Sequence, residues 1–65
     1  MKLYITRDKN KELFLWPMKP TKGISVWYIL GTVVKSIRLN SDEFTEVKWE
    51  DPEPTEVKLV IKKKV

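Results

Sequence analysis

The sequence predicts an all-β fold in which residues 1–65 form one small domain. Short runs rich in β-branched and aromatic residues, which fit a pleated surface, recur along the chain. Segments with proline, glycine or asparagine separate these runs and suit turns. Because a flat sheet would leave one apolar side bare, the strands must curl around one core. We therefore expect five or six antiparallel strands in a strongly bent sheet or a partly open SH3-like barrel, with one short helical turn near residues 41–44.

The central stretch Ile24–Leu39 holds most of the bulky apolar residues in the middle third of the chain. Residues 24–30 place apolar side chains on both faces of an extended strand, which indicates a strand covered on both sides. Residues 32–39 come closer to an alternation of apolar and polar residues. Gly31 divides the two runs, and it suits either a tight turn, which mean strand length favours, or a bulge in one bent strand. This stretch is the predicted core hairpin.

The start of the chain predicts another hairpin, because residues 2–7 and 11–16 both alternate. Asp8-Lys9-Asn10 suits a three-residue loop, with Asn10 in the left-handed conformation. Two cross-strand pairs follow from this loop: Tyr4 with Phe14, and Ile5 with Leu13. One face of the hairpin is then aliphatic (Leu3, Ile5, Leu13, Leu15) and the other aromatic (Tyr4, Phe14, Trp16).

Three further segments complete the predicted fold. The prolines within residues 17–23 predict a connecting loop. Asn40 followed by acidic residues predicts the single helical turn, with Phe44 in the core. Residues 45–49 and 55–61 predict a last hairpin, in which Val47 pairs with Val57. That register brings opposite charges together: Lys48 faces Glu56, and Glu46 faces Lys58.

The composition favours a binding protein over an enzyme. The chain has no His and no Cys, so it lacks the usual general base near neutral pH and the usual zinc ligands. Its net charge is +4, yet residues 41–56 carry seven acids against one lysine, which weakens attraction to a phosphate backbone. These acids lack the spacing of a calcium loop, so we expect a solvated acidic surface. No enzymatic activity, cofactor or metal site is predicted.

The aromatic face of the first hairpin is the candidate binding surface. Small barrels stack single-stranded nucleic acid on strand faces where aromatic residues lie beside lysines. The candidate surface comprises Tyr4, Phe14, Trp16, Lys2, Arg7, Lys11 and Lys19. The alternative is that these aromatic residues belong to the core, because each one buries ~150–250 Å² there. Trp27 and Trp49 are assigned to the core.

Two segments stand out as sequences: YITRDKNKELFLW near the start and LNSDEFTEVKWEDPEPTEVKLVI near the end. They contain a hairpin turn and a Trp-acid-Pro loop. In these segments the chain resembles small uncharacterised proteins of phages, prophages and other mobile elements of gut bacteria. The resemblance implies a bacterial or phage cytoplasmic context and an accessory role. It brings no catalytic or binding residues with it.

The leading functional hypothesis is a non-catalytic small binding module that mediates protein–protein contact or self-association in a phage or mobile-element context. It would work through the aromatic face or through an exposed strand edge. The alternative is a single-stranded nucleic-acid-binding domain that uses the same aromatic and basic residues. A third and weaker hypothesis is a metal-dependent hydrolase built on the acidic residues. No stretch approaches the roughly 18 apolar residues of a membrane span, so we expect a cytoplasmic protein without a membrane partner, and no small-molecule substrate is indicated.

Overall fold

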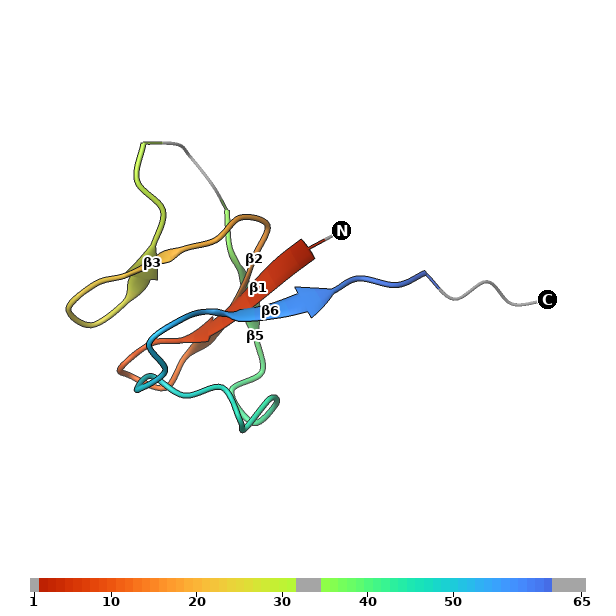
Figure 1. Cartoon of the computed structure of the whole chain (residues 1–65). Helices are drawn as coiled ribbons and strands as arrows, with labels where there is room; N and C mark the ends of the chain where they lie inside the picture. Colours follow the sequence, from red (N-terminus) through yellow and green to blue (C-terminus); the bar gives the residue numbers. More distant parts are fainter. Residues whose placement is uncertain (1, 32–34, 62–65) are drawn as a thin grey trace.

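The computed structural model describes residues 2–31 and 35–61 of the chain. These residues form strands and no helix, which confirms the predicted all-β class (Figure 1). The six strands are β1 (Lys2–Arg7), β2 (Leu13–Trp16), β3 (Thr21–Lys22), β4 (Trp27–Tyr28), β5 (Ile37–Leu39) and β6 (Thr55–Lys58). Four of them form an antiparallel sheet in the order β5-β2-β1-β6, while β3 and β4 form a separate two-stranded sheet. The larger sheet is not closed, which agrees with a partly open barrel.

The hairpin of β1 and β2 forms where the alternation predicts it, but its register differs by two residues. The observed pairs are Tyr4–Trp16, Ile5–Leu15, Thr6–Phe14 and Arg7–Leu13, in place of the predicted Tyr4–Phe14 and Ile5–Leu13. Lys11, with a φ of 77°, takes the left-handed position that was predicted for Asn10. Asn10 Oδ1 instead accepts a hydrogen bond from the Glu12 amide at 3.0 Å. Because side chains alternate with a period of two, the shift keeps the aliphatic and aromatic faces as predicted.

The predicted core hairpin over residues 24–39 is wrong. Strand β4 pairs with β3, in a segment that was predicted to be only a loop. Ile24, which was placed at the start of a core strand, is 95% exposed. The β3–β4 turn is tight, since a Cβ on Gly23 would lie 2.8 Å from the carbonyl oxygen of Val26. The part of the prediction that concerns residues 32–34 lies outside the described residues.

Trp27 attaches the small sheet to the large one. Its side chain is buried, which confirms the prediction that it belongs to the core. Its indole Nε1 donates a 3.2 Å hydrogen bond to the carbonyl oxygen of Arg7, and its backbone amide donates to Asp8 Oδ1 at 3.0 Å. Trp49, which was also predicted to lie in the core, is only half-buried. Lys22 Nζ lies 4.4 Å from the ring centroid of Trp49.

Strands β5 and β6 pair with the two edges of the first hairpin rather than with neighbouring segments. Ile37 of β5 lies opposite Leu15, and Val57 of β6 lies opposite Leu3. The predicted hairpin between residues 45–49 and 55–61 is therefore wrong, because residues 45–49 contain turns and no strand. Its charge pairs, Lys48–Glu56 and Glu46–Lys58, are replaced by an ion pair of Lys2 with Glu56 at 3.8 Å.

Residues 40–51 form a chain of reverse turns. Three i to i+3 hydrogen bonds define them, joining Asn40 O to Glu43 N, Phe44 O to Val47 N, and Lys48 O to Asp51 N. The helical turn predicted near residues 41–44 is therefore a single reverse turn, which stops at Phe44 because its φ of 49° is left-handed. Phe44 is 40% exposed, so its predicted place in the core is wrong. Val47, only 2% exposed, fills that place.

The core lies between the aliphatic face of the large sheet and residues 40–51. Its buried members are Ile5, Leu13 and Val47, with Leu15, Leu39 and Val57 packed against them. Strand pairing extends the aliphatic face from the first hairpin across β5 and β6, because directly opposite residues share a face. Burying each such side chain contributes about 1.5–3 kcal/mol. Val47 covers the end of the face that Ile5 and Leu13 occupy.

Candidate functional site

The three aromatic residues of the candidate surface lie on one face of the large sheet. Tyr4 and Trp16 are directly opposite each other, and the ring centroids of Phe14 and Trp16 are 6.4 Å apart. Trp16 is buried, and its indole Nε1 donates a 2.8 Å hydrogen bond to the hydroxyl of Thr6. Tyr4 and Phe14 are half-buried. The aromatic face is therefore divided, with Trp16 packed in the interior and two rings partly accessible.

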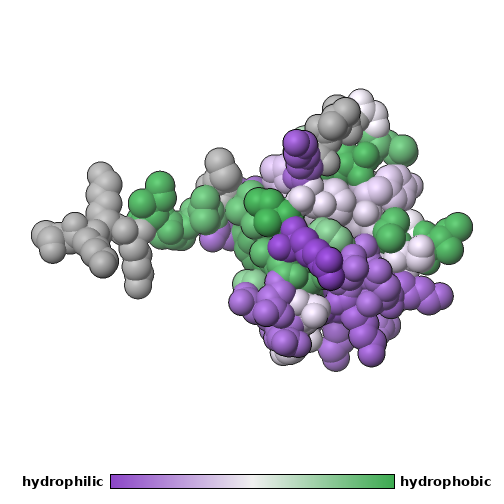
Figure 2. Space-filling view, turned by 180° about the vertical axis from the view of Figure 1, so that it is seen from behind, coloured by the Kyte–Doolittle hydropathy of each residue, from purple (hydrophilic) through white to green (hydrophobic). Residues whose placement is uncertain are grey.

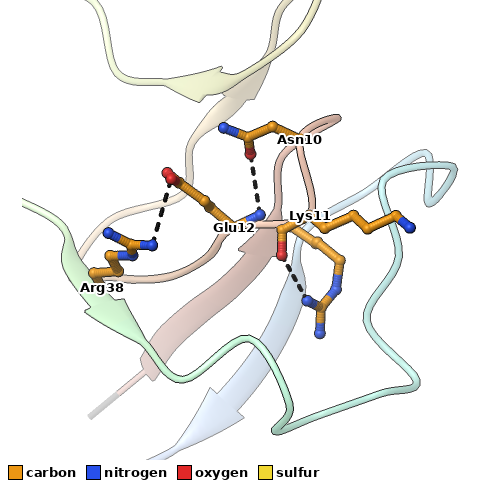
Figure 3. Close-up of polar contacts among 5 residues, drawn as sticks. Asn10, Lys11, Glu12 and Arg38 are labelled. Carbon is orange, nitrogen blue, oxygen red and sulfur yellow. Dashed lines mark hydrogen bonds and ion pairs between the residues drawn. The ribbon is translucent and has the colours of Figure 1, made fainter.

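The predicted basic residues are not gathered around these rings. Lys2 shares the strand face of Tyr4, but it forms an ion pair with Glu56. Lys19 lies in the loop after β2, where its Nζ is 3.3 Å from a carboxylate oxygen of Glu53. Lys11 lies in the β1–β2 turn (Figure 3). Of the four predicted cations, Lys2 is the one on the same strand face as the aromatic residues.

Arg7 lies on the opposite, aliphatic face and holds the fold together. All five of its N–H donors reach backbone carbonyl oxygens, those of Val47 (2.7 Å), Lys11 (2.9 Å), Ser41 (3.0 Å), Glu43 (3.0 Å) and Phe44 (3.3 Å). Four of these acceptors belong to the turns of residues 40–51, which carry Val47 over the core. Arg7 therefore positions these turns and has no donor left for a ligand.

Two cations on the aromatic face were not predicted from the sequence to lie there. Arg38 of β5 lies opposite Phe14, and Lys58 of β6 lies opposite Lys2. Arg38 Nη2 also lies 3.5 Å from a carboxylate oxygen of Glu12 (Figure 3). The alternation of residues 37–39 already placed Arg38 on a polar face. Its neighbour Phe14 could not be predicted, because β5 pairs with a strand far away in sequence.

An apolar groove lies at the end of the aliphatic face that Val47 leaves uncovered. The groove has a volume of about 380 Å³, and it is lined by Leu3, Leu15, Pro17, Lys35, Ile37 and Leu59. Ile37 is 61% exposed, and the three residues after β6, Leu59, Val60 and Ile61, are all exposed as well. Figure 2 shows hydrophobic residues gathered where the C-terminal segment leaves the body of the protein. No sequence motif marks this groove, because strand pairing alone brings its residues together.

A second cavity, of about 500 Å³, lies between the β1–β2 turn and residues 40–51. Charged residues of both signs line it, including Lys9, Lys11, Asp42, Lys48 and Glu50. Asp8 also lines it and is buried, and this burial raises the pKa of its carboxyl above the usual 3.8. The hydrogen bond from the Trp27 amide acts to lower that pKa, and the charge of Glu12 acts to raise it. With both signs of charge present, the cavity favours no single class of ligand.

Two further observations concern the described residues. Within residues 2–31 and 35–61, no three acidic side chains lie close enough together to hold a metal ion. In the same part of the chain, no helix is long and apolar enough to cross a bilayer. The candidate contact surfaces are the apolar groove and the half-buried rings of the aromatic face.

No family model, curated protein or solved structure matches this chain. Its function must therefore be inferred from the geometry of its own residues.

Proposed function

We propose that this chain is a non-catalytic binding module that contacts other proteins through the apolar groove and the edge of β6 beside it. The observation that carries the proposal is the open groove itself. Leu3 and Leu15 line its floor, and exposed Ile37 and Leu59 lie at its border. Together with the exposed residues 59–61, the groove offers an apolar surface to which another protein could bind.

The β6 edge supports the same proposal. Among the described strands, β6 pairs with β1 alone, so one side of its backbone has no strand beside it. An unpaired edge presents a row of N–H and C=O groups that can bind an extended segment of another protein. Because Leu59 lines the groove directly after β6, one bound segment could contact both the backbone edge and the groove.

The wider context of this proposal is a phage or mobile-element protein that acts in the cytoplasm. That context rests on the sequence resemblance of the two terminal segments. An SH3-like arrangement of the strands also belongs to the proposal, supported by the short antiparallel strands and the open sheet.

The test is a selection of extended peptides from a random displayed library against the immobilised protein. We expect selected peptides to alternate apolar and polar residues, because alternate side chains would enter the groove. Their affinity should fall by at least about tenfold in Ile37→Asp and in Leu59→Asp, which place a charge in the groove. Ile24→Asp is the matched control, since Ile24 is also an exposed apolar residue but does not line the groove. Failure to select any peptide when the protein has single-chain mass, or equal binding by Ile37→Asp, would contradict the proposal.

Single-stranded nucleic-acid binding is kept as a second candidate because Arg38 lies opposite the half-buried Phe14. Lys2 and Lys58 lie on the same face beside Tyr4. A titration with a labelled mixed-sequence single strand at two salt concentrations separates the two candidates. Phosphate contacts lose affinity steeply as salt rises, whereas apolar protein contacts do not. If the chain binds proteins and not nucleic acid, we expect no tight, salt-sensitive complex with the labelled nucleic acid.

A further inference from the structure

We propose that the partner of the β6 edge is a second copy of this chain, with the two β6 strands paired antiparallel about a twofold axis at Val57. This inference rests on the proposed function, because it uses the same edge. The pairing would join two four-stranded sheets into one continuous sheet. Contacts of this kind, in which the same patch serves both copies, are the commonest way in which identical chains associate.

The charges of β6 are complementary to themselves in this register. Glu56 and Lys58 flank Val57. With the axis at Val57, Glu56 of each copy lies opposite Lys58 of the other, so the contact contains two opposite-charge pairs. Moving the axis to Glu56 would place two glutamates opposite each other, and moving it to Lys58 would place two lysines opposite each other. Like charges directly opposite are unfavourable, so the charge pattern selects the axis at Val57.

A slip of the pairing by a single residue is excluded by the two faces of the sheet. Val57 belongs to the aliphatic face, because it lies opposite Leu3. Glu56 belongs to the other face, because it lies opposite Tyr4. A one-residue slip would place the aliphatic side chains of one copy beside the charged side chains of the other.

Within one copy, Lys58 has an unfavourable neighbour. It lies directly opposite Lys2, and the carboxylate of Glu56 is 3.8 Å from Lys2 Nζ. Among residues 2–31 and 35–61, no carboxylate lies within 4.0 Å of Lys58 Nζ. Glu56 of a second copy would bring a carboxylate to this position. The proposed pairing therefore supplies the opposite charge that Lys58 lacks within its own described chain.

The aliphatic face also continues across the proposed contact. Val57 would meet Val57 of the second copy on the axis. Leu59, 56% exposed in one copy, would lie opposite Thr55 of the other copy, whose neighbour on β1 is Ile5. The row Ile37–Leu15–Ile5–Thr55 would thus gain a leucine at its open end. In Figure 1, residues 59–61 extend away from the body after β6.

The test uses two charge reversals and their mixture, with the mass in solution measured by sedimentation. Wild type should have twice the mass of one 7.7 kDa chain. Glu56→Lys alone and Lys58→Glu alone should each raise the dimer dissociation constant by at least about tenfold, because each homodimer then contains two like-charge pairs. An equimolar mixture of the two variants should form heterodimers, in which every pair is again opposite in sign. The double variant Glu56→Lys/Lys58→Glu should regain the homodimer.

Glu46→Lys and Lys48→Glu are the matched controls, since they make the same charge changes outside β6 and should dimerise as wild type does. Circular dichroism confirms that each variant is folded, and the double variant remains informative if one single variant is not. A wild type of single-chain mass at every concentration overturns the inference, as does a mixture that forms no heterodimers. If the wild type stays a single chain while peptides still bind the groove, the inference fails and the proposed function stands. If the wild type neither dimerises nor binds peptides, both fail.

Discussion

Arg7 Nε donates a 2.7 Å hydrogen bond to the carbonyl oxygen of Val47, the residue that closes one end of the core. The two residues are 40 positions apart in sequence, so this contact joins the first hairpin to the turns of residues 40–51. The guanidinium is thus used to build the fold.

Arg7→Lys should destabilise the protein although it keeps the positive charge. An ammonium group has three donors and no planar fork, so it cannot reach all the carbonyl oxygens that Arg7 serves. We expect a loss of ~2 kcal/mol in the free energy of unfolding, by analogy with other hydrogen bonds to charged groups. Urea unfolding measures it. Arg38→Lys is the control and should change little, because Arg38 is exposed and makes one ion pair.

Thr6→Val should destabilise the protein despite its similar shape. It removes the hydroxyl that accepts a hydrogen bond from the buried indole of Trp16, and it leaves that N–H without a partner. The expected cost is ~1–3 kcal/mol in the free energy of unfolding. For a domain of this size that loss should lower Tm by at least about 4 °C. An unchanged Tm would show that the indole finds another acceptor.

Trp27→Ala should cost more stability than Trp49→Ala. Trp27 is buried and its indole donates a hydrogen bond to the carbonyl oxygen of Arg7, so its truncation should cost ~3–5 kcal/mol. Trp49 is half-buried, and its main described partner is the ammonium of Lys22, a contact worth about 0.5–2 kcal/mol. Urea titrations of both variants test this order. Equal losses would place Trp49 in the core, as the sequence alone suggested.

The raised pKa of Asp8 makes stability depend on pH. Between the usual value of 3.8 and the raised value, the folded protein binds more protons than the unfolded chain does. The contribution of Asp8 to stability is therefore present below the unfolded pKa and is lost as pH rises through the folded pKa. Asp8→Asn keeps an oxygen that can accept from the Trp27 amide and removes the buried charge.

Unfolding free energies measured at a series of pH values test this account. Asp8→Asn should show a smaller loss of stability than wild type as pH rises above about 4. Asp42→Asn serves as the control for replacing an aspartate by asparagine, because it makes the same change at an exposed position. Parallel curves for Asp8→Asn and wild type would contradict the role given to burial of this carboxyl.

Local patterns in the sequence predict which segments form strands better than they predict which strands pair with each other. Alternation located β1 and β2, and aromatic character identified Trp27 as a core residue. The partner of β6 was missed because a local hairpin with matched charges, Lys48 opposite Glu56, satisfied the same patterns. The partner of β5 was missed because residues 24–30 offered an apolar strand nearer in sequence. The acceptors of Arg7 could not be predicted either, since backbone carbonyls carry no sequence signature and four of them lie 34 to 40 residues away.

The candidate site was predicted in part. The aromatic residues share a face as expected, but Trp16 is buried, and the cation beside Phe14 is Arg38. The apolar groove was missed entirely, because Leu3, Leu15, Ile37 and Leu59 come from four different segments. Such a surface becomes visible only once the strand order is known.

The most direct test of the β6 contact is cysteine crosslinking. The chain contains no cysteine of its own, so only the introduced cysteines can react. With the axis at Val57, the Val57→Cys protein should form a covalent dimer on oxidation or with a short thiol crosslinker. Leu59→Cys alone should form no covalent dimer, whereas an equimolar mixture of Leu59→Cys with Thr55→Cys should crosslink. Efficient crosslinking of Leu59→Cys with itself, or no crosslinking at any of these positions, would contradict the proposed pairing of β6 with β6.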